Sequence, residues 1–148
     1  MQNRYNLLDR EHERELIPLC VDQGVGIVPY SPLGRGFLAG TRTRDGKRVT
    51  TRSRADSLQD ELYGRDEDFD VVDAVVEIAR ERDVAPAQVA VAWLLGKPAV
   101  TAPILGATRV EHVDDALAAV DLALALDETA QLEQPYRSPS LPAAEARR

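Results

Sequence analysis

The sequence predicts an α/β fold built from parallel βα units, with too few strands for a complete sheet. β-Branched stretches at 25–30 and 100–105 alternate with amphipathic helical stretches, a pattern typical of parallel strands joined by helices. A third extended stretch at 2–8 is only a stub. Because parallel strands need cover on both faces, two strands and a stub indicate part of a larger α/β layout.

The first half of the chain combines one helix, one strand and a long basic loop. Apolar residues at helical spacing predict a helix over 12–22, and the strand at 25–30 is broken by turn residues at 31–36. Residues 41–56 are rich in arginine. This loop is either solvated or folds over an anionic ligand.

The second half is mainly helical. An amphipathic helix is predicted over 69–82, and a second helix over 86–95 begins with a proline and is apolar nearly all round, so we expect it to be buried. A last short helix is expected over 127–134. The domain is expected to cover 1–136, and residues 137–148 to form a disordered tail.

A strand end, a glycine turn and a helix start follow one another at 103–112. Gly106 permits a sharp turn or close approach of a ligand, and Thr108 with Glu111 has the spacing of a capping box. A helix start favours an anion, and Arg109 adds positive charge. These residues alone leave open a capped turn with a solvated arginine and a phosphate site. The helix that follows has an apolar face formed by Val110, Val113, Leu117 and Val120.

Composition excludes several functional classes. The chain has 148 residues and a net charge of −7, which argues against a general nucleic-acid binder. There is no apolar run of about 18 residues and no signal peptide at the start, so no membrane partner is expected. One cysteine fits a reducing cytoplasm, and the two histidines and Cys20 lack the spacing of a metal site.

Three segments resemble the carboxyl-terminal portion of the aldo-keto reductases. They are 2–10 (QNRYNLLDR), 24–36 (GVGIVPYSPLGRG) and 103–108 (PILGAT), which stand in the family's order with the helix at 86–95 before the third. The resemblance covers 2–136 and implies the end of strand six onward of a (β/α)8 TIM barrel, whose complete form needs about 250 residues. It also implies a cytoplasmic oxidoreductase that interconverts carbonyls and alcohols with NADP(H), or less often NAD(H).

The resemblance implies roles in binding the nicotinamide and the pyrophosphate. Gln2 matches the glutamine that hydrogen-bonds the nicotinamide carboxamide, which suits an amide with both a donor and an acceptor. Tyr30 matches the aromatic residue that stacks on the nicotinamide, although an ordinary tyrosine at a strand end is the alternative. The loop along the pyrophosphate corresponds to Ser31, Leu33, Gly34 and Gly36.

The resemblance places the adenosine end of the cofactor on the later turn. The residues matching the turn that holds the adenosine 2′-phosphate are Gly106, Ala107, Thr108 and Arg109. His112 stands where the family often has arginine or glutamine on the adenine side, and Asp115 stands at a usual glutamate. Ala116 replaces the frequent asparagine, a departure from the family's adenine recognition.

The catalytic Asp, Tyr, Lys and His of the family lie on its first four strands, which have no counterpart here. No lysine is placed to activate Tyr30 or Tyr63, because Lys47 falls in a loop and Lys97 just past a helix end. Carbonyl reduction needs a proton donor near the developing alkoxide, and the sequence offers no candidate. We therefore expect no catalytic residue in this chain.

Two readings of the function follow. The first, which the resemblance implies, is that the chain is the carboxyl-terminal fragment of an NADP(H)-dependent aldo-keto reductase. Such a fragment would be inactive without an amino-terminal piece that completes the site for a small carbonyl substrate. The alternative is a non-catalytic truncated product, or a nucleotide-binding or interaction remnant. In both cases an incomplete barrel leaves strand edges and an apolar interior open, which predicts self-association.

Overall fold

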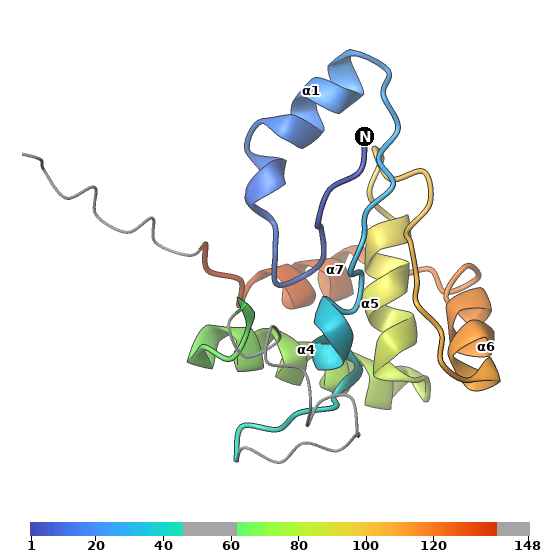
Figure 1. Cartoon of the computed structure of the whole chain (residues 1–148). Helices are drawn as coiled ribbons and strands as arrows, with labels where there is room; N and C mark the ends of the chain where they lie inside the picture. Colours follow the sequence, from blue (N-terminus) through green and yellow to red (C-terminus); the bar gives the residue numbers. More distant parts are fainter. Residues whose placement is uncertain (46–61, 139–148) are drawn as a thin grey trace, which may run out of the picture.

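The computed structural model describes residues 1–45 and 62–138 (Figure 1). Most of the basic loop at 41–56 and all but the first two residues of the tail at 137–148 lie outside the described residues. Figure 1 shows α1 at one end of the molecule, α4 at the other and α5 between them. In chain order the helices are η1 (Glu11–Glu13), α1 (Leu16–Asp22), η2 (Gly34–Ala39), α4 (Asp66–Arg82), α5 (Pro86–Leu95), α6 (Val110–Ala118) and α7 (Leu126–Glu133), where η marks a 3₁₀ helix.

Three extended segments lie side by side in parallel. Tyr30 pairs with Arg4 on one side and with Ile104 on the other, and Ile27 pairs with Val100. The segment around 26–30 is therefore the central one, flanked by the stub at the start of the chain and by the segment at 99–104. The predicted parallel arrangement is confirmed.

The predicted strands are nevertheless wrong in extent, because within the described residues each pairing is an isolated bridge. Pro29 and Pro103 have no backbone N–H, so each removes one donor from a ladder that the sequence pattern favoured. Pro29 can only accept, and its carbonyl takes a hydrogen bond of 2.8 Å from the N–H of Ile104. The outer edges of the two flanking segments have no neighbouring strand in the part of the chain that the structure describes.

One face of these segments is buried and the other is open. Successive residues of an extended segment point to opposite faces. Ile27 is buried in a small cluster with Cys20 and Ala99, against which α1 packs, whereas Tyr30 is 43% exposed and Ile104 is exposed as well. Parallel segments covered by helices on one face and open on the other are the arrangement expected of part of a barrel.

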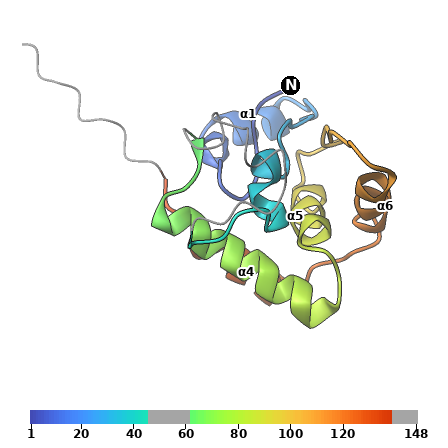
Figure 2. The same ribbon diagram turned by 60° about the horizontal axis from the view of Figure 1, so that its bottom comes forward.

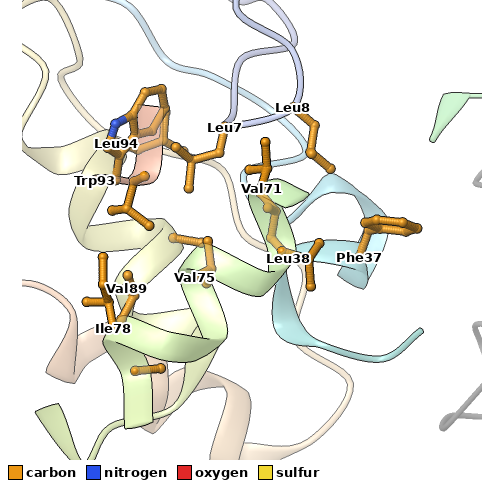
Figure 3. Packing of buried hydrophobic residues seen from close by; sticks show 14 of the residues in the cluster. Leu7, Leu8, Phe37, Leu38, Val71, Val75, Ile78, Val89, Trp93 and Leu94 are labelled. Carbon is orange, nitrogen blue, oxygen red and sulfur yellow. The ribbon is translucent and has the colours of Figure 1, made fainter. Parts of the chain in front are cut away.

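The main hydrophobic core lies between α4, α5 and η2. Figure 3 shows the side chains of α4 pointing toward those of α5, with η2 and the segment at 7–8 closing the cluster. Full burial of each such side chain contributes about 1.5–3 kcal/mol. The core therefore anchors η2, and with it the end of the loop at 31–36. The labelled members are Leu7, Leu8, Phe37, Leu38, Val71, Val75, Ile78, Val89, Trp93 and Leu94.

The predictions for α4 and α5 are confirmed, with one change of boundary. α4 begins three residues earlier than predicted, because the Asp68 carboxylate accepts hydrogen bonds from the backbone N–H groups of Gly64 (2.9 Å) and Arg65 (3.0 Å) ahead of the helix. α5 begins at Pro86, as predicted, and is buried along 89–94. None of the helices in the described ranges is long and apolar enough to cross a membrane.

The helix predicted over 12–22 is divided into η1 and α1. Pro18 accounts for the division, because it has no N–H to donate to the carbonyl of Arg14 one turn earlier and its ring crowds that carbonyl. The α-helix therefore starts only at Leu16, after a short 3₁₀ turn. The last predicted helix, over 127–134, is confirmed within one residue at each end as α7.

The apolar face of α6 is exposed. The predicted stripe consists of Val110, Val113 and Leu117 on the helix and Val120 just after its end, and these side chains are between 46% and 72% exposed. α6 packs on α5 through another side of the helix and lies at the margin of the molecule (Figure 2). An apolar stripe of this regularity ordinarily faces a core. Within the described residues, nothing packs against it closely enough to bury it.

Candidate functional site

The carboxyl ends of the parallel segments bring the two predicted cofactor loops to one edge. Tyr30 and Ile104 form a bridge, so the loop at 31–36 and the turn at 105–109 leave neighbouring segments on the same side. Arg4 also pairs with Tyr30, and Gln2 lies two residues before Arg4. The strand period therefore puts Gln2 and Tyr30 on the same open face. Ligand sites of parallel α/β folds lie at this end of the strands.

The loop after Tyr30 has an unusual backbone. Positive φ angles occur at Ser31 (54°), Gly34 (53°), Arg35 (58°) and Gly36 (96°). Two of these residues carry a side chain, and non-glycine residues in this region are uncommon and strained. Gly34 is also enclosed, since a Cβ there would lie 3.2 Å from Leu8 Cδ1. Contacts with surrounding residues, rather than intrinsic backbone preference, therefore hold the loop at 31–36 in this conformation.

Asn6, which is not among the predicted site residues, supplies part of that support. Its side-chain Nδ2 donates to the carbonyl of Ser31 (2.9 Å) and to the hydroxyl of Tyr63 (3.3 Å), while Oδ1 accepts from the N–H of Leu8 (2.8 Å). Asn6 is fully buried. A polar residue inside an apolar stretch was the only signal that could have identified it.

Two amides of the loop are already engaged. The N–H of Gly34 donates to the Ser31 carbonyl (3.0 Å), and the N–H of Gly36 donates to the Leu33 carbonyl (2.9 Å). A pyrophosphate at this loop would therefore need other donors, or a rearrangement of these two bonds. Leu33 itself packs against the hydrophobic core.

The turn at 105–109 is open. Gly106 has no positive φ, and a Cβ placed on it would meet nothing within 4 Å. Within the described residues, neither backbone conformation nor crowding requires glycine there. Ala107, Thr108 and Arg109 are exposed as well. The turn therefore leaves room for a ligand to approach its backbone.

The predicted capping box at this turn is wrong. The N-cap of α6 is Arg109, one residue after Thr108, and no side chain caps the helix. The N–H of Thr108, which a capping box would pair with the Glu111 side chain, points instead to Nδ1 of His112 (3.4 Å). The N–H groups in the first turn of α6 lack a side-chain cap, and such groups favour an anion.

His112 and Asp115 occupy different positions relative to this turn. His112 contacts both Thr108 and Arg109, with 3.1 Å between Arg109 Nη2 and His112 Nε2. Asp115 is turned toward α5, where its Oδ1 accepts a hydrogen bond from Nε2 of Gln88 (2.8 Å). The structure therefore brings His112, but not Asp115, into contact with the residues of the turn.

Arg44, in the described part of the basic loop, is engaged by residues of α4. Its guanidinium pairs with Asp70 (2.7 Å) and Asp73 (3.0 Å) of α4 and lies over the ring of Phe69. These two carboxylates hold the pKa of Arg44 above its ordinary value. For this residue the structure favours attachment to α4 over contact with an anionic ligand.

Lys97 and Tyr63 are each engaged by other residues. The ammonium of Lys97 is bonded to the Glu133 carboxylate and lies 4.4 Å from the centre of the Trp93 ring. Tyr63 is buried, and burial raises its pKa, which opposes loss of its proton. No group of His, Cys, Asp and Glu within residues 1–45 and 62–138 could hold a metal ion.

A hollow of about 540 Å³ lies elsewhere, between α1 and residues 97–100. Tyr5 lines it, and burial raises the pKa of this phenol while its hydroxyl donates to Glu13 (2.7 Å). None of the predicted cofactor residues lines this hollow. The hollow is therefore separate from the edge that gathers them.

Comparison with known proteins identifies the relatives of this chain. The model of the aldo/keto reductase family matches residues 1–137. A candidate aryl-alcohol dehydrogenase of Schizosaccharomyces pombe is 44% identical over 141 residues, covering 92% of this chain and 38% of that protein. The versiconal hemiacetal acetate reductase of Aspergillus parasiticus is 39% identical over 139 residues, covering 92% of this chain and 39% of that protein.

A solved structure shows the same fold. The crystal structure of the thermostable aldo-keto reductase Tm1743 with the inhibitor epalrestat superposes with a TM-score of 0.64 at 29% identity, covering 90% of this chain and 38% of that one. The predicted fold class, the carboxyl-terminal portion of a (β/α)8 barrel, is confirmed as a partial barrel. The chain spans less than two fifths of the length of these relatives.

Proposed function

Because the chain belongs to the aldo/keto reductase family, we propose that it is the cofactor-binding, carboxyl-terminal part of an NADP(H)-dependent carbonyl reductase. The observation that carries the proposal is the parallel pairing of Tyr30 with both Arg4 and Ile104. This pairing collects residues from three separate segments at one edge. These residues are the ones that the proposal assigns to the cofactor.

The nicotinamide half of the proposed site consists of Gln2 and Tyr30. Both lie on the open face, Gln2 is exposed, and the Tyr30 ring is 43% exposed. The Gln2 amide can both donate to and accept from a carboxamide. The Tyr30 ring offers an apolar face on which the nicotinamide can stack. The pyrophosphate would then lie along the loop that runs toward Gly36. When bound, the cofactor supplies the hydride for carbonyl reduction.

The adenosine half of the proposed site is the turn from Gly106 to Arg109. Its fit to a phosphate rests on the open space over Gly106, the N–H groups of the first turn of α6, which no side chain caps, and the Arg109 guanidinium. This donor set favours the 2′-phosphate of NADP(H) over the 2′-hydroxyl of NAD(H). Ala116 removes the family's usual amide contact with adenine, so the phosphate contributes a larger share of recognition.

We propose that the chain binds cofactor without turnover. Hydride transfer to a carbonyl requires a proton donor at the oxygen that becomes the alcohol. Tyr63 is buried against Asn6, and Lys97 is engaged by Glu133, so neither supplies that proton. A small carbonyl substrate would meet a complete site only together with the strands that the longer relatives possess.

The test is a pair of measurements on the purified chain. Titration of NADPH, followed by its fluorescence, measures binding, and absorbance at the nicotinamide band with an excess of aldehyde measures oxidation. We expect saturable binding, weakened in the R109A variant and unchanged in R44A, whose arginine is held by α4. We expect no carbonyl-dependent oxidation.

The outcomes separate the two parts of the proposal. Absence of saturable NADPH binding overturns the assignment of the cofactor edge. Measurable turnover by the chain alone overturns the assignment of a non-catalytic part. Binding without turnover supports both, whether the chain acts with an amino-terminal portion or as a nucleotide-binding remnant.

A further inference from the structure

His112 lies where two hydrogen-bond donors of the cofactor turn converge. The N–H of Thr108 points to Nδ1 (3.4 Å), and the Arg109 guanidinium approaches Nε2 through Nη2 (3.1 Å) and Nε (3.4 Å). A neutral imidazole has one acceptor nitrogen, because the other carries the proton. The ring can therefore accept from only one of the two donors at a time.

The charges around His112 are few. Arg109 is the cation beside it, and on its own helix Glu111 is adjacent and Asp115 lies one turn further along. α5, the helix packed against α6, has no charged residue between Pro86 and Leu95 and contributes only Gln88, which donates to Asp115. In the free chain, the charged group that contacts the ring is therefore the Arg109 guanidinium.

A phosphate at this turn would change both the hydrogen bonds and the charge that the ring faces. Its oxygens accept from the Thr108 N–H and from Arg109, so both donors leave the imidazole. A phosphate monoester carries a charge of about −1.5 to −2 near pH 7, which outweighs the single charge of Arg109. Both ring nitrogens are then free of donors, and a protonated ring can donate to the phosphate.

We propose that His112 takes up one proton from solvent when an adenosine 2′-phosphate binds at the Gly106–Arg109 turn, and so selects the phosphorylated cofactor. This inference rests on the proposed function, because it uses the same turn. The proton adds to a ring nitrogen and the phosphate accepts a hydrogen bond from it, with no covalent bond made or broken. His112 is thus a specificity-determining residue whose contribution depends on pH.

The sign of the pH dependence follows from proton uptake. Binding that takes up a proton is strengthened at low pH and weakened as the pH rises, and histidines in general change charge between pH 5 and 8. The phosphate titrates near pH 6 in the opposite sense, since binding favours its dianion. A comparison of variants is needed to separate the two effects.

The experiment uses 2′-AMP as the probe, because it carries the phosphate without the nicotinamide half of the cofactor. The chain has only two histidines, so H112Q is the test variant and H12Q, in η1, is the matched control. Calorimetric titrations in two buffers with different protonation enthalpies give the protons taken up. We expect uptake by the wild type and H12Q that is lost in H112Q, with affinity at pH 6 about tenfold weaker in H112Q and nearly equal at pH 8.

A second readout needs no substitution of His112. In NMR spectra of the wild type, saturation with 2′-AMP should shift the ring signals of one histidine toward the protonated form at pH 7. Equal proton uptake by wild type and H112Q, or unshifted ring signals in the saturated wild type, overturns this inference alone. Failure of 2′-AMP to bind any of the three proteins between pH 6 and 8 overturns it together with the proposed cofactor edge.

Discussion

Tyr30 and Ile104, which are 74 residues apart, pair as a parallel bridge, and the N–H of Ile104 donates to the carbonyl of Pro29 at 2.8 Å. The loop at 31–36 and the turn at 105–109 therefore begin side by side. This relationship turns two separate sequence motifs into two ends of one candidate cofactor site.

The Tyr30 ring should account for a measurable part of cofactor affinity. We expect Y30A to weaken NADPH binding by about tenfold, because stacking of an aromatic ring on a base-like ring is worth about 1–3 kcal/mol. Y30F should bind nearly as well as the wild type, since it keeps the ring. Fluorescence titration measures both. Equal losses in Y30A and Y30F would assign the contribution to the hydroxyl instead.

Gly26 is required by the close approach of Thr101. A Cβ at residue 26 would overlap Thr101 Oγ1, far inside van der Waals contact. We expect G26A to lower the free energy of unfolding by about 1–3 kcal/mol, the usual cost of overpacking. Chemical denaturation followed by circular dichroism measures the change.

Two further variants identify the cause of that loss. T101A removes the oxygen, so the double variant G26A/T101A should recover most of the stability lost in G26A. G96A is the matched control, because a Cβ there would have only ordinary contacts at 3.5 Å and beyond, with φ at −73°. If G96A were as destabilising as G26A, the cost would lie in glycine replacement itself and not in this contact.

Glu133 should make stability depend on acid pH. Burial acts to raise its pKa, but hydrogen bonds from Lys97 and Trp93 and the charge of Arg10 outweigh burial and hold the pKa below its ordinary value. A depressed carboxyl pKa stabilises the fold above the unfolded value of about 4.3, and this stabilisation is lost as the pH falls through the folded value.

Replacement of this carboxylate tests the assignment. We expect E133Q to lose about 1 kcal/mol at pH 7, a small figure because solvent screens the partly exposed group, and to show a flatter stability profile below pH 5. E81Q, at an exposed residue of α4, is the control and should retain the wild-type profile. Thermal melts between pH 3 and 7 measure how stability depends on pH in both variants and the wild type. If E133Q lost stability below pH 5 as steeply as the wild type, the assignment would be contradicted.

The exposed face of α6 should make the isolated chain associate with further copies of itself. Leu117 lies in the exposed apolar stripe of α6. The outer edge of the segment at 99–104 has no strand neighbour in the described part of the chain. Burial of the stripe by a second copy removes apolar surface from water, and the open edge can pair with another strand.

A polar substitution on that face should therefore favour the monomer. We expect L117Q to shift the mass measured by sedimentation or light scattering toward the monomer. L126Q is the matched control, because Leu126 is 92% exposed at the start of α7 and lies outside the stripe. A wild-type chain that is monomeric at high concentration with a cooperative melt would contradict this prediction.

Local sequence patterns were sufficient to predict most helices and the parallel direction of the extended segments. The apolar period of α4, the proline that opens α5 and the glycines of the loop at 31–36 are short-range features, and the structure contains them within a few residues of where the patterns put them. The α/β class and the family motifs rest on the same short-range information, because helix period, strand alternation and turn residues are written in neighbouring positions.

Long-range contacts decided the rest. Asn6 holds Ser31 from 25 residues away, and the Thr108 amide points to His112 instead of completing the predicted capping box. The stripe on α6 remains exposed because no described segment packs against it. Each outcome depends on which distant groups meet, and no local pattern encodes that. Burial and competition between hydrogen-bond donors are properties of the assembled chain, so these features became visible only once the segments were placed together.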